Sequence, residues 1–199
     1  RVRKAIDMAI DREGFVNHLL AGHGEVAVGP FPKALPFGAS HVHGVSYQPD
    51  EARKLLEEAG WKDTDGNGYV DKDGKDLTIR WLTYPGRMEL PALAELAQDN
   101  LKQIGIKVDV ECSADHLKVL ETGNYDVYAS ALVTAPTGDP EYFFHTCALD
   151  QSTKNRGFYH NDRLEALAKE MHQTFDIEKR NQLAIEMQQI ILDDHAFYF

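Results

Sequence analysis

The sequence predicts an α/β fold in which a small, mostly parallel sheet is covered by helices and followed by a helical C-terminal third. Strand-like and helix-like patterns alternate along residues 77–133, and such alternation at short spacing favours parallel strands with right-handed crossovers. Residues 164–191 repeat apolar positions at helical spacing. The 199 residues are 43% hydrophobic and 27% charged, which indicates a globular chain with its own core.

The first 60 residues predict two short helical segments, a long loop and a third helix. Apolar residues at helical spacing begin the chain, and Asp11 can cap a second helix over residues 12–20. Proline and glycine interrupt residues 22–48, which we expect to form a loop. Pro49 suits the start of the next helix because the N–H that proline lacks would have no partner there, and Gly60 ends it.

The middle of the chain predicts the sheet. Strands are expected near residues 77–82, 106–111 and 125–133, separated by helices over residues 89–104 and 114–122. The last third predicts two helices from these apolar positions: Leu164, Leu167, Ala168, Met171, Leu183, Ile185, Met187, Ile190 and Ile191.

Charge and hydropathy exclude two classes of partner. A net charge of −11 argues against nucleic acid, because phosphate binding needs clustered lysine and arginine. No segment approaches the roughly 20 apolar residues that span a bilayer, so we expect no direct membrane insertion.

The chain starts at Arg1 without an initiator methionine and ends on the apolar run 196–199, which predicts a fragment of a longer protein. Cys112 and Cys147 permit one disulfide or two free thiols.

A polar segment from Asp63 to Gly74 resembles a calcium loop. Its acidic and amide residues fit the first nine positions of an EF-hand loop, with Asp63, Asp65, Asn67 and Asp71 as calcium ligands. The twelfth position, which should hold a bidentate glutamate, is Gly74. The segment therefore predicts either a weak calcium site in a structural or adhesion module, or a polar turn before the strand.

Histidines suggest a further alternative. His41 and His43 lie two residues apart in a loop and raise the hypothesis of a metal-dependent hydrolase. His145 is the other candidate metal ligand, and His160 lies in the same region. No zinc-ligand spacing, nucleophile elbow or phosphate-binding glycine loop accompanies them. We therefore expect that the protein is not an enzyme.

Loops at the ends of the predicted strands are the expected place for ligand contacts, as in other α/β sheets. Arg156 belongs to a separate long loop, and its guanidinium suits a carboxylate. For Asp139 the alternative is a cap on a helix that begins at Glu141. The candidate ligand-binding residues are Tyr84, Arg87, Thr134, Thr137, Asp139 and Arg156.

Several stretches resemble the family of peptide-, dipeptide- and nickel-binding receptors of ABC transporters. Residues 2–13 resemble the start of that family's C-terminal lobe, and residues 49–61 resemble its helix that ends in Gly-Trp. Residues 125–127, followed by Ala-Pro-Thr-Gly-Asp-Pro at 135–140, resemble the strand and loop at the edge of the ligand cleft. The resemblance covers essentially all 199 residues in the expected order.

The resemblance implies a periplasmic-binding-protein-like fold, with residues 1–199 as a single C-terminal lobe. The solute would lie between this lobe and an N-terminal lobe outside the chain, and a membrane permease would be the partner. The implied location is periplasmic or extracellular, with a lipid anchor in a Gram-positive cell. The stretches 83–87 and 134–140 resemble the nickel-type branch, which implies a nickel chelate as solute. Thr134 departs from the aromatic residue of that branch, so a short peptide stays open.

Overall fold

The computed structural model describes all 199 residues and divides into two compact units. The first, called the sheet unit below, comprises residues 1–26 and 46–131. The second, called the helical unit, comprises residues 27–45 and 132–199. The proposal that the whole chain forms one lobe of a receptor stays a prediction.

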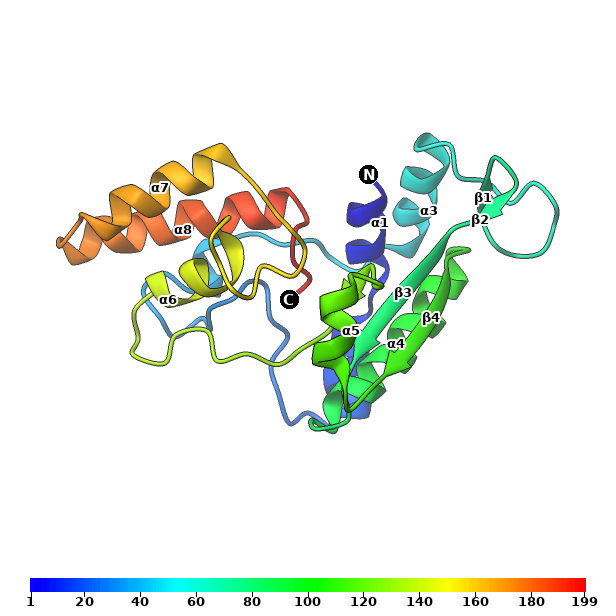
Figure 1. The fold of residues 1–199 in the computed structure, drawn as a ribbon, viewed down its shortest axis with the longest axis horizontal. Coiled ribbons are helices and arrows are strands. Elements are labelled where there is room, and N and C mark those ends of the chain that lie inside the picture. Colours follow the sequence, from blue (N-terminus) through cyan, green and yellow to red (C-terminus); the bar gives the residue numbers. More distant parts are fainter. The chain divides into compact units, whose positions relative to one another are not determined.

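The sheet unit contains the predicted parallel sheet (Figure 1). Strand β3 (Thr78–Thr83) lies in the centre, between β4 (Lys107–Cys112) and β5 (Val127–Tyr128). Both neighbours are parallel to β3. The prediction of three parallel strands in one sheet is confirmed.

Helix α4 (Glu89–Gln103) connects β3 to β4 and packs against both strands. It buries Leu90, Ala94, Ala97 and Leu101, which recur every three or four residues and so form a single apolar face. Helix α5 (His116–Thr122) connects β4 to β5 and ends at Gly123, whose φ of +69° lies in the left-handed region that glycine adopts readily.

Two further helices of the sheet unit pack on each other, α1 (Val2–Ala9) and α3 (Pro49–Glu58). In the sequence between α1 and α3, the expected helix over residues 12–20 is only partly α-helical. It consists of α2 (Arg12–Gly14), which Asp11 caps by accepting a hydrogen bond from the Gly14 amide at 2.8 Å, and the π-helical turn η1 (Phe15–Leu19). Strands β1 (Asp71–Lys72) and β2 (Lys75–Asp76) form a small antiparallel hairpin.

The strand expected over residues 125–133 is wrong in length, because β5 covers only two residues. Its partner β3 ends at Thr83, so the ladder runs out. The Ala129 amide donates to the Leu82 carbonyl at 2.9 Å, and the Thr83 hydroxyl donates to the Ala129 carbonyl at 3.0 Å. Beyond these bonds no strand is available for pairing.

The helical unit confirms the predicted C-terminal helices, α7 (Asp162–His172) and α8 (Ile177–Asp193). They lie side by side and are preceded by α6 (Glu141–Phe143) and the π-helical turn η3 (Phe144–Ala148) (Figure 1). The short 3-10 turn η2 (Ala39–His41) interrupts the otherwise irregular segment 27–45. This segment contributes Phe31 and Phe37 to the core.

The core of the helical unit contains residues from segment 27–45 and from α6, η3, α7 and α8. Phe144 is fully buried, and burying a side chain of this size stabilises the fold by about 1.5–3 kcal/mol relative to its exposure. The larger core residues are Phe31, Phe37, Phe143, Phe144, Leu164, Leu167, Met171, Leu183, Met187 and Ile191.

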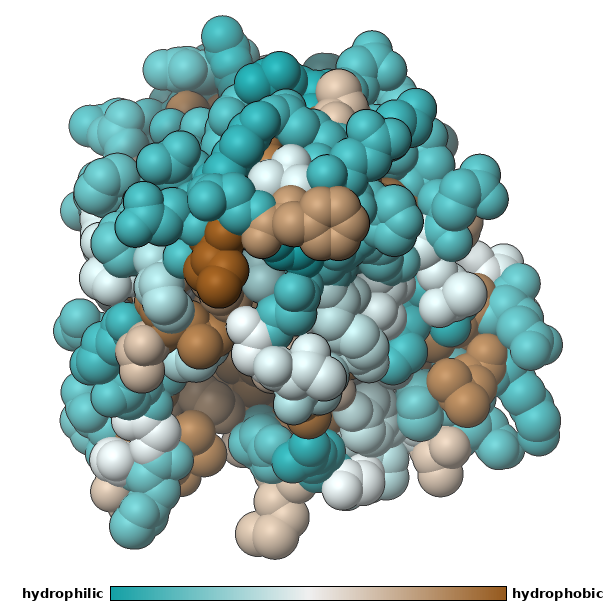
Figure 2. Space-filling model, turned by 90° about the vertical axis from the view of Figure 1, so that its left-hand side faces the viewer, coloured by the Kyte–Doolittle hydropathy of each residue, from teal (hydrophilic) through white to brown (hydrophobic).

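The surface in Figure 2 is mostly hydrophilic, with apolar residues in scattered groups, as expected of a face that meets water. Among the helices, none combines the length and the apolar character that a bilayer crossing requires.

Candidate solute-binding site

Three aromatic rings gather at the carboxyl end of the sheet. Tyr84 follows β3, Tyr128 ends β5 and His116 begins α5. The His116 ring stacks on the Tyr84 ring at a centroid distance of 4.3 Å and lies nearly parallel to the Tyr128 ring at 6.1 Å. The amide of Ala131 donates a 3.2 Å hydrogen bond to the Tyr84 hydroxyl, which orients the phenol. Parallel strands bring these three residues together because their carboxyl ends share one edge.

His116 carries a polar atom without a partner. Its Nδ1 is buried and makes no hydrogen bond, whereas most buried polar atoms in proteins are paired. An unpaired buried donor or acceptor costs about 1–3 kcal/mol, so a group that pairs with this nitrogen would be favoured. Neutral imidazole can donate a hydrogen bond, accept one or ligate a metal ion.

Of the residues predicted from the sequence, the sheet unit holds Tyr84 and Arg87. Tyr84 belongs to the aromatic edge, together with His116 and Tyr128. Arg87 is exposed and lies 3.9 Å from a Glu89 carboxylate oxygen. Sequence reasoning did not single out His116 or Tyr128, because they fall inside the expected helix over residues 114–122 and the expected strand over residues 125–133, and ligand contacts were sought in loops at strand ends.

The helical unit holds the other four candidates. Thr134 is half-buried, and Thr137 and Arg156 are exposed. Asp139 accepts a hydrogen bond from the Glu141 amide at 2.8 Å and contacts Arg180 at 2.9–3.0 Å. The alternative reading of Asp139 as a helix cap therefore describes its contacts, and its role with a solute stays a prediction, as does that of the other three.

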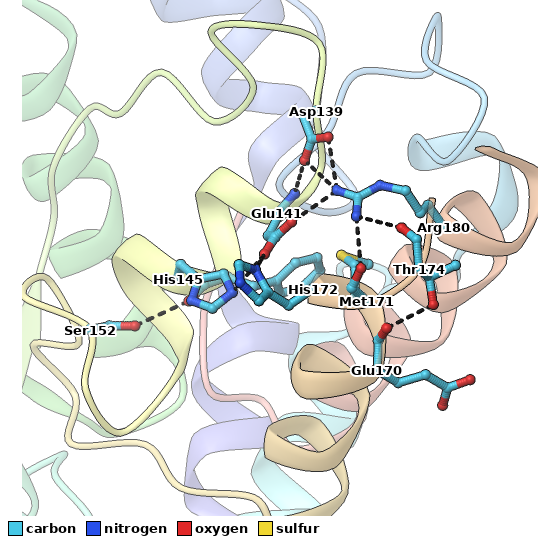
Figure 3. A network of polar contacts seen from close by, with 10 residues as sticks. Asp139, Glu141, His145, Ser152, Glu170, Met171, His172, Thr174 and Arg180 are labelled. Atoms are coloured by element: carbon cyan, nitrogen blue, oxygen red, sulfur yellow. Dashed lines mark hydrogen bonds and ion pairs between the residues drawn. The ribbon is translucent and has the colours of Figure 1, made fainter. Parts of the chain in front are cut away.

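Arg180 is the centre of a polar network in the helical unit (Figure 3). Its guanidinium contacts Asp139 and also Glu141, whose Oε2 lies 2.9 Å away. It donates to the carbonyls of Met171 at 2.7 Å and Thr174 at 3.1 Å. This network connects the start of α6 to the end of α7 and the beginning of α8.

Two histidines contact the same carboxylate, Glu141. Its Oε1 lies 3.1 Å from His145 Nε2 and 2.7 Å from His172 Nδ1. Partial burial raises the pKa of Glu141, but the hydrogen bonds from His172 and Arg180, together with electrostatic attraction from His145 and Arg180, outweigh burial and lower it overall. One atom from each of Glu141, His145 and His172 lies within 4.8 Å of the other two, so these residues are a candidate metal set.

The acidic loop from Asp63 to Gly74 forms a hydrogen-bonded turn. Asp63 accepts bonds from the amides of Gly66 at 2.7 Å and Gly68 at 3.0 Å. The other predicted calcium ligands behave alike: Asp65 accepts from the Asn67 amide, Asn67 accepts from the Tyr69 amide, and Asp71 accepts from the amide and hydroxyl of Thr64. Three of the four, Asp63, Asp65 and Asp71, also cluster. These contacts fit the alternative of a polar turn.

The other reactive groups make no comparable site. His41 and His43 belong to no group of three metal-ligating side chains, and the His43 backbone instead bonds the side chain of Gln189. Cys112 is exposed and Cys147 buried, and both are free thiols. Burial raises the pKa of the Cys147 thiol.

Open α/β sheets bind their ligands at the carboxyl ends of the strands, which is the edge where Tyr84, His116 and Tyr128 gather. The chain belongs to the bacterial extracellular solute-binding proteins of family 5. The model described as "Bacterial extracellular solute-binding proteins, family 5 Middle" matches residues 1–155.

Two relatives show the range of the family. The oligopeptide-binding protein AppA of Bacillus subtilis is 32% identical over 214 residues, which cover 100% of this chain and 38% of AppA. The nickel-binding protein NikA of Staphylococcus aureus is 27% identical over 185 residues, which cover 92% of this chain and 35% of NikA. The chain thus spans less than two fifths of the length of these relatives.

Solved structures of both relatives share the fold. AppA in complex with a nonapeptide matches with a TM-score of 0.85 and 28% identity over 100% of this chain and 40% of that chain. NikA of Staphylococcus aureus in complex with Ni(L-His)2 matches with a TM-score of 0.86 and 25% identity over 98% of this chain and 40% of that chain. The predicted family and fold class are therefore confirmed, and neither relative is named as an enzyme or as a calcium-binding module.

Proposed function

We propose that this chain is part of a receptor that captures a small solute outside the cytoplasmic membrane and delivers it to an ABC-transporter permease. Membership of an extracellular solute-binding family supports this role. The carboxyl edge of the sheet unit, formed by Tyr84, His116 and Tyr128, is the surface that contacts the solute. The observation that carries the proposal is the sheltered, unpaired Nδ1 of His116 within this aromatic edge.

The solute that this edge suits best is a nickel ion held by a small organic chelator. Imidazole nitrogen is a preferred ligand of Ni²⁺. The tyrosine rings beside His116 offer flat, partly apolar surfaces for the carbon atoms of a chelator. The likeness to NikA, solved with Ni(L-His)2, supports this solute. A location in the periplasm or on the cell surface, with a lipid anchor in a Gram-positive cell, belongs to the same proposal.

A short peptide is the second candidate. It is favoured by AppA, which matches the entire chain at 32% identity and was solved with a nonapeptide. In this case the His116 nitrogen would form a hydrogen bond with the peptide, and the tyrosine rings would cover its side chains.

Calorimetric titration of the complete receptor that contains this chain tests the proposal. Ni²⁺ with L-histidine, Ni²⁺ alone and a mixture of short peptides are the three titrants. We expect the nickel–histidine complex to bind, and His116→Ala to weaken its binding at least about tenfold, since one lost interaction of about 1.4 kcal/mol has that effect. His23→Ala is the matched control, because His23 is an exposed histidine of the same unit.

Each outcome of the titrations supports or excludes one candidate solute or the candidate site. Binding of peptides alone, weakened by His116→Ala, would replace the nickel chelate with the second candidate. Unchanged affinity of His116→Ala for every titrant that binds would contradict the aromatic edge as the solute site.

A further inference from the structure

The helical unit contains a group of side chains that the proposed function does not use. We infer that Glu141, His145 and His172 bind one divalent transition-metal ion, such as Zn²⁺, at the surface of this unit. The site goes beyond solute capture and does not involve the aromatic edge of the sheet unit.

The three side chains already converge on one point (Figure 3). Glu141 Oε1 lies 3.1 Å from His145 Nε2 and 2.7 Å from His172 Nδ1, and the three ligand atoms are within 4.8 Å of one another. In a tetrahedral zinc site with bonds of about 2.0–2.2 Å, neighbouring ligand atoms are about 3.3–3.6 Å apart. Small side-chain movements would therefore admit the ion.

The backbone explains this convergence. Glu141 and His145 are four residues apart on consecutive helical turns, α6 and η3, which places Glu141 Oε1 3.1 Å from His145 Nε2. His172 lies in the last turn of α7, which packs against α6. Two histidines and one carboxylate are a known ligand set for zinc, with water in the remaining position.

Arg180 holds the carboxylate in the orientation that an ion requires. It contacts Glu141 Oε2 at 2.9 Å, which leaves Oε1 toward the two histidines. Arg180 is itself fixed by Asp139 and by the carbonyls of Met171 and Thr174. Such outer contacts commonly fix the geometry of metal ligands. The charges of Arg180 and Asp139 offset each other, so Glu141 remains as the net negative charge beside the ion.

The exposure of the two histidines and competition from protons make binding of the ion reversible. The side chains of His145 and His172 are 48% and 74% exposed, against 22% for Glu141. An ion can therefore enter from solvent, and water can complete its coordination. Binding requires both imidazoles to be neutral, so the ion competes with protons for them.

His160 offers a contrast within the same unit. Its Nδ1 lies 2.9 Å from Asp150, whereas its Nε2, on the opposite side of the ring, lies 3.1 Å from Asp162. The two carboxylates face different ring nitrogens, so they cannot share an ion with the histidine. Substitution of His160 is therefore a matched control for a histidine paired with carboxylates.

The test is titration of the untagged protein with ZnCl2, followed by calorimetry, and with CoCl2, followed by visible absorption of bound cobalt. We expect one ion per chain that depends on Glu141. The variants Glu141→Gln, His145→Ala and His172→Ala should each weaken binding at least about tenfold, and Asp139→Asn by about 10–100-fold as a positioning residue. His160→Ala and His116→Ala should bind as the unchanged protein does, which separates this site from the solute site.

Circular dichroism of each variant checks that it is folded, and the highly exposed His172 is the substitution least expected to disturb the fold. No zinc binding, binding that His172→Ala leaves unchanged, or equal loss in His160→Ala and His172→Ala would overturn the inference.

Discussion

Each unit contains an arginine that contacts acidic side chains, and the surroundings of the two arginines differ. In the sheet unit, Arg80 contacts Asp126 with the two side chains 47% and 37% exposed. In the helical unit, Arg180 is 16% exposed and contacts Asp139 and Glu141. Water screens the first pair and competes for its hydrogen bonds. In the second network Arg180 and Glu141 are more withdrawn from water, at 16% and 22% exposed, whereas Asp139 is 44% exposed.

The comparison shows which interactions fix the geometry of each unit. Backbone pairing along β3 fixes the neighbours β4 and β5 of the sheet unit, so Arg80 adds to a geometry that the ladder already defines. The helical unit has no sheet, and its short α6 is connected to α7 and α8 through Arg180. In the helical unit, side-chain hydrogen bonds therefore connect the elements, as backbone hydrogen bonds connect the strands in the sheet unit.

The largest expected effect comes from removing each arginine. Arg180→Met leaves two carboxylates and two carbonyls without their shared donor, and should lower the free energy of unfolding by about 3 kcal/mol. Arg80→Met should lower it by much less, because water screens the exposed pair with Asp126. Urea unfolding of both variants measures the difference. Equal losses would show that burial does not separate the two networks.

A smaller effect is expected in the acidic loop of the sheet unit. Asp71→Ala removes three hydrogen-bond contacts with Thr64 from a residue that is 6% exposed, and should cost about 2 kcal/mol. The exposed Asp65→Ala is the matched control and should cost less than about 0.5 kcal/mol.

Both losses should be the same with and without calcium, and thermal unfolding with added CaCl2 or chelator checks this. We expect the loop to bind calcium more weakly than a Kd of about 10⁻⁵ M, because position twelve lacks a carboxylate. Tighter binding, or stabilisation by calcium that Asp71→Ala abolishes, would make the loop a calcium site.

The smallest effect concerns His160 of the helical unit. A hydrogen bond with Asp150 and the charge of that carboxylate raise the pKa of His160 above 6.5. Because the folded pKa is the higher one, the stabilisation is fully present below pH 6.5 and is lost as the pH rises through the folded pKa. NMR titration of the imidazole measures the shift. Asp150→Asn should return the pKa toward 6.5, and an unchanged value would exclude Asp150 as the cause.

The periodicity of apolar residues in the sequence was sufficient to predict the helices and strands that depend on local contacts. Leu90, Ala94, Ala97 and Leu101 marked the buried face of α4, and the alternating residues of β3 and β4 marked two strands of one sheet. The strand over 125–133 was overestimated because its length depends on where β3 ends, which residues 125–133 do not encode.

For the candidate sites, the sequence alone determined the family and the regions from which ligand contacts come, because ordered motifs and strand ends are local features. Tertiary structure decided which side chains meet. It stacked His116 against Tyr84, which lies 32 residues earlier, and brought His172 to Glu141. It also placed Phe31 and Phe37, in a segment expected to be a loop, within the helical core. Such contacts depend on how whole elements pack, and no local pattern records that packing.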